Sequence, residues 1–249
     1  MIKTAVFVVA GMGTRFLPAT KTIAKEMFPI VDKPLVQYAV EDALKAGVTN
    51  LVFITSKSKK ALEDFFDKDA MLERELEEAG KDELLKTLRS IVPQNVQISF
   101  VRQTEPKGVA HALWCARALL EKEPFYMLYP DDLIDGELSA CQQLKTAYET
   151  NPMSMLAVQE VEFDKCHLYG VMDVAKEVLP GQYLLNGIVE KPKSNPPSNL
   201  VAVGRYIVTP SLFAEILKLH TSTAKEWPMM DAWTTLCTEG LVSAVKITG

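Results

Sequence analysis

The stretch that decides the fold is Thr4-Ala-Val-Phe-Val-Val-Ala-Gly-Met-Gly-Thr-Arg15. Its first seven residues are almost continuously apolar, which is the pattern of a strand covered on both faces of a parallel sheet. Gly11 and Gly13 follow directly, and glycines after a buried strand let the backbone turn tightly and direct its N–H groups toward an anion. The stretch therefore predicts a phosphate-binding loop at the edge of an α/β sheet.

Three kinds of glycine loop compete for this sequence. A dinucleotide-binding G-x-G-x-x-G loop needs glycine at position 16, where the chain has Phe16. A Walker loop needs a terminal G-K-[ST], which the residues after Gly13 do not supply. A nucleotidyltransferase loop has G-x-G-T-R followed by a lysine about ten residues later, and Lys25 stands there. The extended string favours this last reading, although two glycines alone also fit an ordinary turn.

The rest of the chain alternates between strand and helix patterns. Three more apolar runs resemble strands: 51–54, 96–101 and 125–129. Helical spacing follows Asp32, which is expected to cap that helix, and Gly47 is expected to end it; residues 108–121 indicate another helix. This alternation predicts an α/β, Rossmann-like fold with a mixed, mainly parallel sheet and helices on both faces.

Composition limits the function classes. The 249 residues include 27 Lys and Arg against 32 Asp and Glu, a net charge of −5 that argues against a nucleic-acid partner. No apolar run approaches the roughly 18–20 residues of a membrane span, and the N-terminus lacks a signal-peptide pattern. Four cysteines occur without a C-x-x-C pair, which argues against a disulfide framework or a zinc site. We expect a cytoplasmic protein with no membrane partner.

One domain is expected over residues 1–249, because no linker, repeat or low-complexity segment interrupts the chain. Residues 57–91 are densely charged and predict a helical hairpin on the surface. His111 lies on the predicted helix 108–121, where a lone histidine is more often packed than catalytic. Trp227 and Trp233 are expected to pack in a core or a lid and not to form a cofactor site.

The chain resembles the bacterial UTP–glucose-1-phosphate uridylyltransferases of the sugar nucleotidyltransferase superfamily, whose fold is the nucleotide-diphospho-sugar transferase type. The motifs that carry the resemblance are Gly11-Met-Gly-Thr-Arg-Phe-Leu-Pro-Ala-Thr-Lys21, Lys25-Glu-Met27, Pro29-Ile-Val-Asp-Lys-Pro34, Val101-Arg-Gln-Thr-Glu-Pro-Lys-Gly108, His111-Ala112, Pro130-Asp-Asp132, Val158-Gln-Glu-Val161, Tyr169-Gly-Val171, Val189-Glu-Lys-Pro192, Pro197-Ser-Asn-Leu200 and Gly204-Arg-Tyr206. They occur in order over nearly the whole chain.

The resemblance implies transfer of a uridylyl group from UTP to glucose 1-phosphate, with release of pyrophosphate. It implies three catalytic cations: Arg15, Lys25 and Lys191. The nucleotide would contact Ala10, Gly11, Gly13, Thr14, Gln103 and Gly108. The sugar would contact Tyr169, Gly170, Glu190 and Gly204. Mg²⁺ is the expected cofactor with Asp131 as its ligand, since a carboxylate at a strand end can hold that ion between phosphates.

Two departures from the family pattern keep alternatives open. The family usually has Glu-Ile-Gln-Leu-Thr-Asp-Ala where this chain has Glu226-Trp-Pro-Met-Met-Asp-Ala232, so Pro228 and Met230 stand at positions that concern sugar recognition or subunit contacts. The family also continues into a segment with a second metal-binding aspartate, whereas this sequence ends at Gly249, and we expect that segment to be absent. The alternatives are another hexose 1-phosphate, dTTP in place of UTP, or a non-catalytic regulatory relative. A homodimer or homotetramer is a further expectation.

Overall fold

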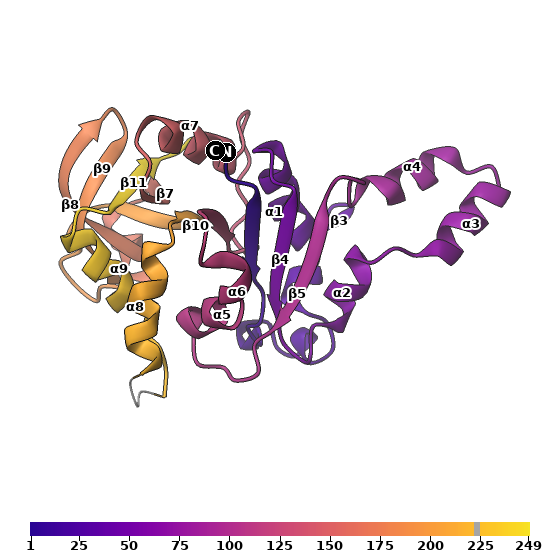
Figure 1. The fold of residues 1–249 in the computed structure, drawn as a ribbon, viewed down its shortest axis with the longest axis horizontal. Coiled ribbons are helices and arrows are strands. Elements are labelled where there is room, and N and C mark those ends of the chain that lie inside the picture. The colour runs from indigo at the N-terminus through magenta and orange to yellow at the C-terminus, as the bar shows by residue number, and fades with distance from the viewer. Residues whose placement is uncertain (222–224) are drawn as a thin grey trace.

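A single mixed sheet organises the protein. The computed structural model describes residues 1–221 and 225–249, and within them nine strands pair in the order β5 (Gln97–Arg102), β4 (Asn50–Thr55), β1 (Thr4–Val8), β6 (Phe125–Leu128), β10 (Leu200–Val208), β7 (Ser154–Glu160), β11 (Val242–Lys246), β9 (Gln182–Glu190) and β8 (Gly170–Leu179) (Figure 1). Strands β5, β4, β1 and β6 are parallel, while β10 runs antiparallel between β6 and β7. The predicted α/β sheet is confirmed.

Helices cover both faces of the sheet, and each face has its own apolar core. One core contains residues of α1 (Leu35–Lys45), α2 (Lys60–Phe66) and α7 (Ala140–Thr150). The other contains residues of α5 (Val109–Cys115), α6 (Arg117–Leu120), α8 (Ser211–His220) and α9 (Met229–Thr238). Strand β1 contributes side chains to both cores, since Ala5 and Phe7 face the first core and Val6 faces the second. This alternation explains why residues 5–8 of the strand are all apolar.

Two local expectations were wrong. Asp32 does not cap α1, because residues 29–34 first form a short hairpin of β2 (Pro29–Ile30) and β3 (Lys33–Pro34), and the residue before the helix is Pro34. The helix expected over 108–121 is two helices, because the backbone of Ala116 leaves the helical region between α5 and α6. Gly47 does follow α1 with a φ of 92°, as expected for a glycine that ends a helix.

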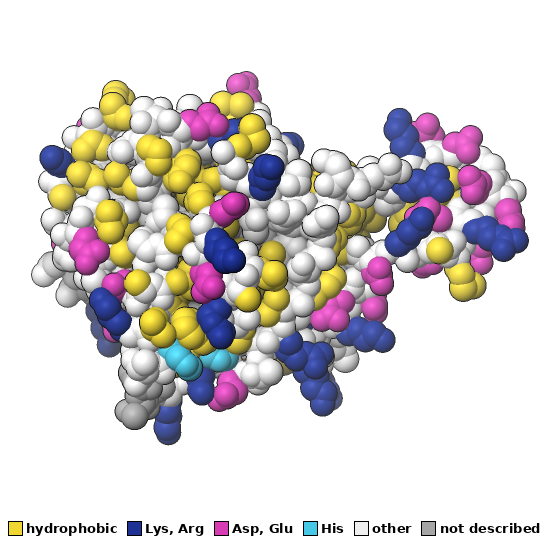
Figure 2. Space-filling model, viewed as in Figure 1, with side chains coloured by type: hydrophobic (Ala, Val, Ile, Leu, Met, Phe, Trp, Pro, Cys, Tyr) yellow, Lys and Arg dark blue, Asp and Glu magenta, His cyan; other side chains and the backbone are white. Residues whose placement is uncertain are grey.

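The charged segment 57–91 extends from the body of the protein. Its outer part is the hairpin of α3 (Ala70–Glu78) and α4 (Asp82–Ser90), which projects away from the sheet (Figure 1). Figure 2 shows basic and acidic side chains intermingled on this hairpin. Helix α3 has no buried residue, so the expected surface hairpin is confirmed for α3 and α4, whereas α2 packs into the core through Leu62 and Phe66. Among residues 1–221 and 225–249, no helix is both long and apolar enough to cross a membrane.

Candidate active site

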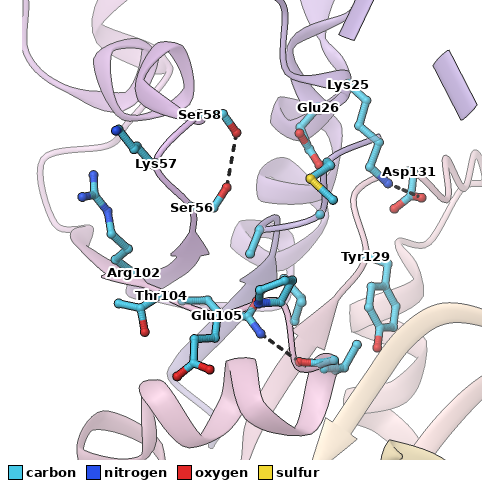
Figure 3. A pocket seen from close by; sticks show the side chains of 18 of the residues that line it. Lys25, Glu26, Ser56, Lys57, Ser58, Arg102, Thr104, Glu105, Tyr129 and Asp131 are labelled. Carbon is cyan, nitrogen blue, oxygen red and sulfur yellow. Dashed lines mark hydrogen bonds and ion pairs between the residues drawn. The ribbon is translucent and has the colours of Figure 1, made fainter. Parts of the chain in front are cut away.

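A cavity of about 960 Å³ opens at the carboxyl ends of four parallel strands. Its walls include Gly11 after β1, Ser56 after β4, Gln103 after β5 and Asp131 after β6. Parallel strands end at one edge of a sheet, so residues that are more than a hundred positions apart meet there. Figure 3 shows Lys25 and Asp131 on one side of the cavity and Ser56, Lys57, Ser58 and Arg102 on the other.

The glycine loop has the backbone that the sequence predicted. Gly13 has a φ of 65°, in the left-handed region that favours glycine, and its carbonyl accepts a hydrogen bond from the Thr20 hydroxyl at 2.9 Å. A Cβ on Gly11 would meet no atom within 4 Å, so the backbone at this position is open to an approaching ligand. A short 3₁₀ turn, Thr14–Phe16, continues from Gly13 and carries Arg15. The loop therefore combines a fixed turn with an accessible backbone.

An ion pair joins the glycine-loop side of the cavity to the end of β6. Lys25 Nζ lies 2.7 Å from Asp131 Oδ2, and their side chains are 18% and 41% exposed (Figure 3). Burial raises the pKa of Asp131, but the hydrogen bond and the charge of Lys25 outweigh it, so the net pKa lies below the usual 3.8. Arg15 contributes to the same lowering through its charge. Two of the three predicted cations therefore act on the predicted metal ligand.

A second, fully buried pair supports this lysine turn. Lys59 Nζ lies 2.6 Å from Glu26 Oε2, and the two side chains are only 3% and 1% exposed. Glu26 follows Lys25 in the 3₁₀ turn Lys25–Met27, while Lys59 precedes α2. Sequence analysis missed this pair, because a separation of 33 residues gives no spacing signal. The pair fixes the backbone from which Lys25 extends.

A buried arginine supports the Asp131 side from behind. Arg205, on β10, donates from Nε to Asp42 Oδ2 at 2.7 Å and from Nη1 to the Tyr129 carbonyl at 3.0 Å. The second oxygen of Asp42 accepts from the backbone N–H of Cys141 at 2.9 Å. Every one of these groups is therefore paired, as buried charges require. The arrangement holds the backbone two residues before Asp131.

Gly204 lies against Asp132, the acidic residue next to Asp131. Its φ is 67°, and a Cβ there would overlap the carboxylate of Asp132. Burial raises the pKa of Asp132, and the negative charge of Asp131 raises it further. Gly204 does not line the cavity; it leaves room for the Asp132 side chain.

Gln103 and Gly108 form the far end of the cavity. Gln103 Nε2 donates to the Gly108 carbonyl at 3.0 Å, and Gly108 has a φ of 90°. A Cβ at Gly108 would lie 3.1 Å from the Trp227 carbonyl oxygen, so glycine is required there. Trp227 is 5% exposed, and its backbone N–H donates to the Lys107 carbonyl at 2.9 Å. The segment Glu226–Ala232, whose sequence differs from the family pattern, therefore packs against the loop that carries Gly108.

Three of the four predicted sugar-binding residues form a separate group with Lys191. Gly170 pairs with Glu190 across β8 and β9, and the backbone N–H of Lys191 donates to the Tyr169 carbonyl at 2.9 Å. Lys191 Nζ lies 3.3 Å from Glu190 Oε1. This group does not line the cavity, but its charge reaches it: burial raises the pKa of Tyr129, and the charges of Asp131 and Glu190 raise it further. The charges of both groups therefore act on Tyr129.

The structure brings most predicted nucleotide residues together. Ala10, Gly11, Lys25, Gln103, Gly108 and Asp131 all line the cavity. The predicted residues outside its lining are Gly13, Thr14, Arg15, Tyr169, Gly170, Glu190, Lys191 and Gly204. Sequence analysis missed the lining residues Tyr129, Arg102 and Lys57. Their position directly after, or at the end of, a predicted strand was the available signal.

A divalent cation fits this edge through one protein carboxylate. Among the described residues no group of three His, Cys, Asp or Glu side chains is placed to hold a metal. Asp131 nevertheless offers a partly exposed carboxylate in the cavity, and Mg²⁺ commonly takes one or two carboxylates and completes its shell with phosphate oxygens and water. The residues therefore fit an ion that is held jointly with a phosphorylated ligand.

Comparison with known proteins agrees with this geometry. Residues 4–247 match the nucleotidyl transferase family. A UTP–glucose-1-phosphate uridylyltransferase of Bacillus subtilis (strain 168) is 42% identical over 93% of this chain and 79% of its own. A Staphylococcus saprophyticus enzyme of the same name is 40% identical over 100% of this chain and 86% of its own.

Solved structures give the same result. A UDP-glucose pyrophosphorylase complexed with UDP-glucose superimposes with a TM-score of 0.88 and 38% identity, covering 100% of this chain and 92% of that one. A UTP-bound enzyme from Acinetobacter baumannii reaches 0.91 at 36% identity, covering 100% and 87%. Nucleotidyl transferases of this kind generally use a divalent metal ion. With its glycine loop, strand-end aspartate and 244 matched positions from 4 to 247, the chain belongs to the nucleotidyl transferase family.

Proposed function

We propose that this protein transfers a uridylyl group from UTP to glucose 1-phosphate, forming UDP-glucose and pyrophosphate. The observation that carries the proposal is the convergence of Gly11, Lys25, Gln103 and Asp131 on one cavity. The names of the relatives at 40–42% identity support the same substrates. The cavity volume of about 960 Å³ is in the range of pockets that hold a nucleotide-sized ligand.

The chemistry requires positioning and charge neutralisation more than a protein base. A phosphate oxygen of glucose 1-phosphate forms a bond to the α-phosphorus of UTP, while the bond from that phosphorus to the bridging oxygen breaks and pyrophosphate leaves. The nucleophile is already an anion, so no proton has to be removed from it. Backbone N–H groups of Gly11, Gly13 and Thr14 bind the triphosphate. Arg15 and Lys25 neutralise the charge on the leaving pyrophosphate.

Asp131 is the residue that would hold Mg²⁺. When bound, the ion would neutralise phosphate oxygens of both substrates and reduce their mutual repulsion. Lys25 lies 2.7 Å from the same carboxylate, so its ammonium group is close to phosphates that are held at Asp131. Lys191 binds the phosphate of the sugar substrate as a point charge.

The remaining predicted residues select the two substrates. Gln103 and the backbone at Ala10 and Gly108 contact the base, since an amide side chain can match the hydrogen-bonding edge of uracil. Glu190 accepts hydrogen bonds from sugar hydroxyls, and Tyr169 and Gly170 border that site across the β8–β9 pair. Gly204 contributes through the room that it leaves for Asp132.

The test is pyrophosphate release from UTP and glucose 1-phosphate with Mg²⁺, run beside dTTP and galactose 1-phosphate. We expect the highest kcat/KM for UTP with glucose 1-phosphate. A higher value for dTTP or for another hexose 1-phosphate would replace the substrate in the proposal. Binding of UTP without turnover would instead favour the non-catalytic alternative. Light scattering of the same sample tests the proposed homodimer or homotetramer.

A further inference from the structure

The side-chain amide of Gln103 is held in one orientation. Its Nε2 atom lies 3.0 Å from the Gly108 carbonyl oxygen and 3.1 Å from His111 Nδ1. A carbonyl oxygen can only accept, so the amide atom that faces Gly108 must be the nitrogen and not Oε1. The two N–H bonds of Nε2 are then both used, one on Gly108 and one on His111.

This orientation determines the protonation of His111. Because Gln103 donates to it, Nδ1 must accept, and the ring proton must be on Nε2. The sulfur of Cys115, a weak acceptor, lies 3.8 Å from Nε2 and 4.0 Å from Nδ1, and the backbone of Glu105 also forms a hydrogen bond with the ring. The imidazole is 8% exposed and packs edge-on against the Trp227 ring at 5.2 Å. Packing therefore prevents the ring from turning to offer its other nitrogen.

The surroundings of His111 keep it neutral. Burial lowers its pKa below the usual 6.5, and the positive charge of Lys107 lowers it further. Of the other groups that face it, Glu105 raises the pKa and His220, on α8, lowers it. Burial raises the pKa of the Cys115 thiol, so that group is uncharged as well. Nδ1 is consequently an acceptor under neutral conditions.

We propose that His111 is a positioning residue that fixes the Gln103 amide with Oε1 toward the cavity, and that this makes the site select UTP over CTP. The inference rests on the proposed function. Gln103 lines the cavity, and with both Nε2 hydrogens occupied it offers an acceptor there. Uracil has one donor on its pairing edge, N3–H, whereas N3 of cytosine is itself an acceptor. Two acceptors would then face each other when CTP binds, and the site rejects it.

The variants His111→Leu and His111→Asn test the proposal. Leucine removes the acceptor and lets the Gln103 amide turn, so the ratio of CTP to UTP dissociation constants should fall about tenfold, the effect of one net hydrogen bond. Asparagine can place its oxygen near the position of Nδ1, so His111→Asn should keep the ratio within about threefold of the wild type. Titration calorimetry with UTP and CTP measures both ratios, and circular dichroism checks that each variant is folded.

Two further tests use the wild-type protein, and the first takes His111→Asn as its control. Long-range ¹H–¹⁵N spectra of the histidine rings should show one of the three with an unprotonated Nδ1 and a protonated Nε2 at neutral pH, and this signal should be missing in His111→Asn. Acidification through the lowered pKa of His111 converts Nδ1 into a donor, so the hydrogen bond from Gln103 Nε2 is lost and only the Gly108 carbonyl still holds the amide. The preference for UTP over CTP should therefore decline in acid.

Three results would overturn the inference. They are an Nδ1-protonated tautomer of His111, a UTP preference that His111→Leu leaves within about twofold, and a preference that does not change on acidification. None of these would affect the proposed function if UTP is still turned over. Absence of UTP binding to the wild type would instead contradict the proposed function, while the tautomer measurement would still decide the geometry at Gln103.

Discussion

The two halves of the sheet differ in strand direction: one is parallel, and the other, called the antiparallel half, is antiparallel except for the parallel pair of β7 and β11. This difference separates their contributions to the site. Strands β5, β4, β1 and β6 are parallel, so their four following loops meet at one edge and form the cavity. Strands β8 and β9 are antiparallel, and the residues they contribute lie across one strand pair from each other. The parallel half therefore gathers the groups for the nucleotide, and the antiparallel half presents those proposed for the sugar.

Strand β10 connects the two halves. It pairs antiparallel with β6 on one side and β7 on the other, and it carries Gly204 and Arg205 directly behind Asp132 and Tyr129. Asp42, on α1, completes the connection through its ion pair with Arg205. A strand from the antiparallel half thus fixes the end of β6, where the predicted metal ligand lies.

The largest effect is expected from breaking this connection. Asp42→Ala leaves the Arg205 guanidinium, which is 2% exposed, without its partner, and removal of one member of a buried pair typically costs about 3–5 kcal/mol. Urea denaturation measures the change. Glu41→Ala is the matched control, since Glu41 forms an accessible pair with Lys33 that is worth about 0.2–1 kcal/mol. Equal losses for the two variants would show that the buried connection contributes nothing special.

Substitution of one lysine in each half tests whether the two halves act on different substrates. Lys25→Ala removes a cation that faces developing charge, and kcat should fall about 100–1,000-fold, or about 3–4 kcal/mol. Lys191→Ala, in the antiparallel half, should mainly raise KM for glucose 1-phosphate. Steady-state kinetics separates these effects, and Lys57→Ala, on the opposite wall of the cavity, is the control for loss of a nearby charge. A silent Lys25→Ala would remove this lysine from the reaction.

Sequence analysis predicted the parallel half better than the antiparallel half. Parallel strands such as 4–8 and 50–55 have a continuous apolar run, 5–8 and 51–54, so both the strands and the position of Gly11 after the first of them follow from local pattern. Asp131 followed from the same rule. The order of β7 to β11 depends on long-range pairing, for which the chain gives no local signal.

The side chains that support the site also could not be predicted from the sequence. The pairs Glu26–Lys59 and Asp42–Arg205 join residues 33 and 163 positions apart, and only the folded backbone brings them together. Gly204 was expected at the sugar, but its reason for being glycine is the carboxylate of Asp132. His111 was expected to be packed, and its burial confirms this. Its hydrogen bond to Gln103 depends on the path of the loop 103–108 between β5 and α5, which no periodicity predicts.

Gly204→Ala tests how closely β10 must approach Asp132. Gly204 and Gly240 both have a positive φ, 67° and 72°, so alanine at either position should cost about 1–2 kcal/mol of backbone strain. Only at Gly204 does the new Cβ overlap a side chain, whereas at Gly240 nothing lies within 4 Å. Gly204→Ala should therefore lose about 1–3 kcal/mol more in urea denaturation than Gly240→Ala. Equal losses would mean that Asp132 moves away freely.

The smallest effect concerns the two adjacent acids at the end of β6, whose pKa values shift in opposite directions. Although burial raises it, the pKa of Asp131 is lowered overall by Lys25, so the unfolded chain binds more protons and this carboxylate stabilises the fold above about pH 4, a contribution that is lost as the pH falls. The pKa of Asp132 is raised by burial and by Asp131, so the folded protein holds its proton longer, and ionisation of Asp132 reduces stability as the pH rises.

The asparagine variants separate these opposite signs. At neutral pH, Asp131→Asn should lower the free energy of unfolding by about 0.2–1 kcal/mol, the range for solvent-accessible pairs, because the Lys25 contact loses its charge. Asp132→Asn removes an unfavourable buried charge and should leave stability equal or higher. Urea denaturation repeated near pH 4 should bring Asp131→Asn and the wild type closer together. A loss of stability in Asp132→Asn would show that this carboxylate is held by favourable contacts, so that the antiparallel half stabilises its charge as well as its position.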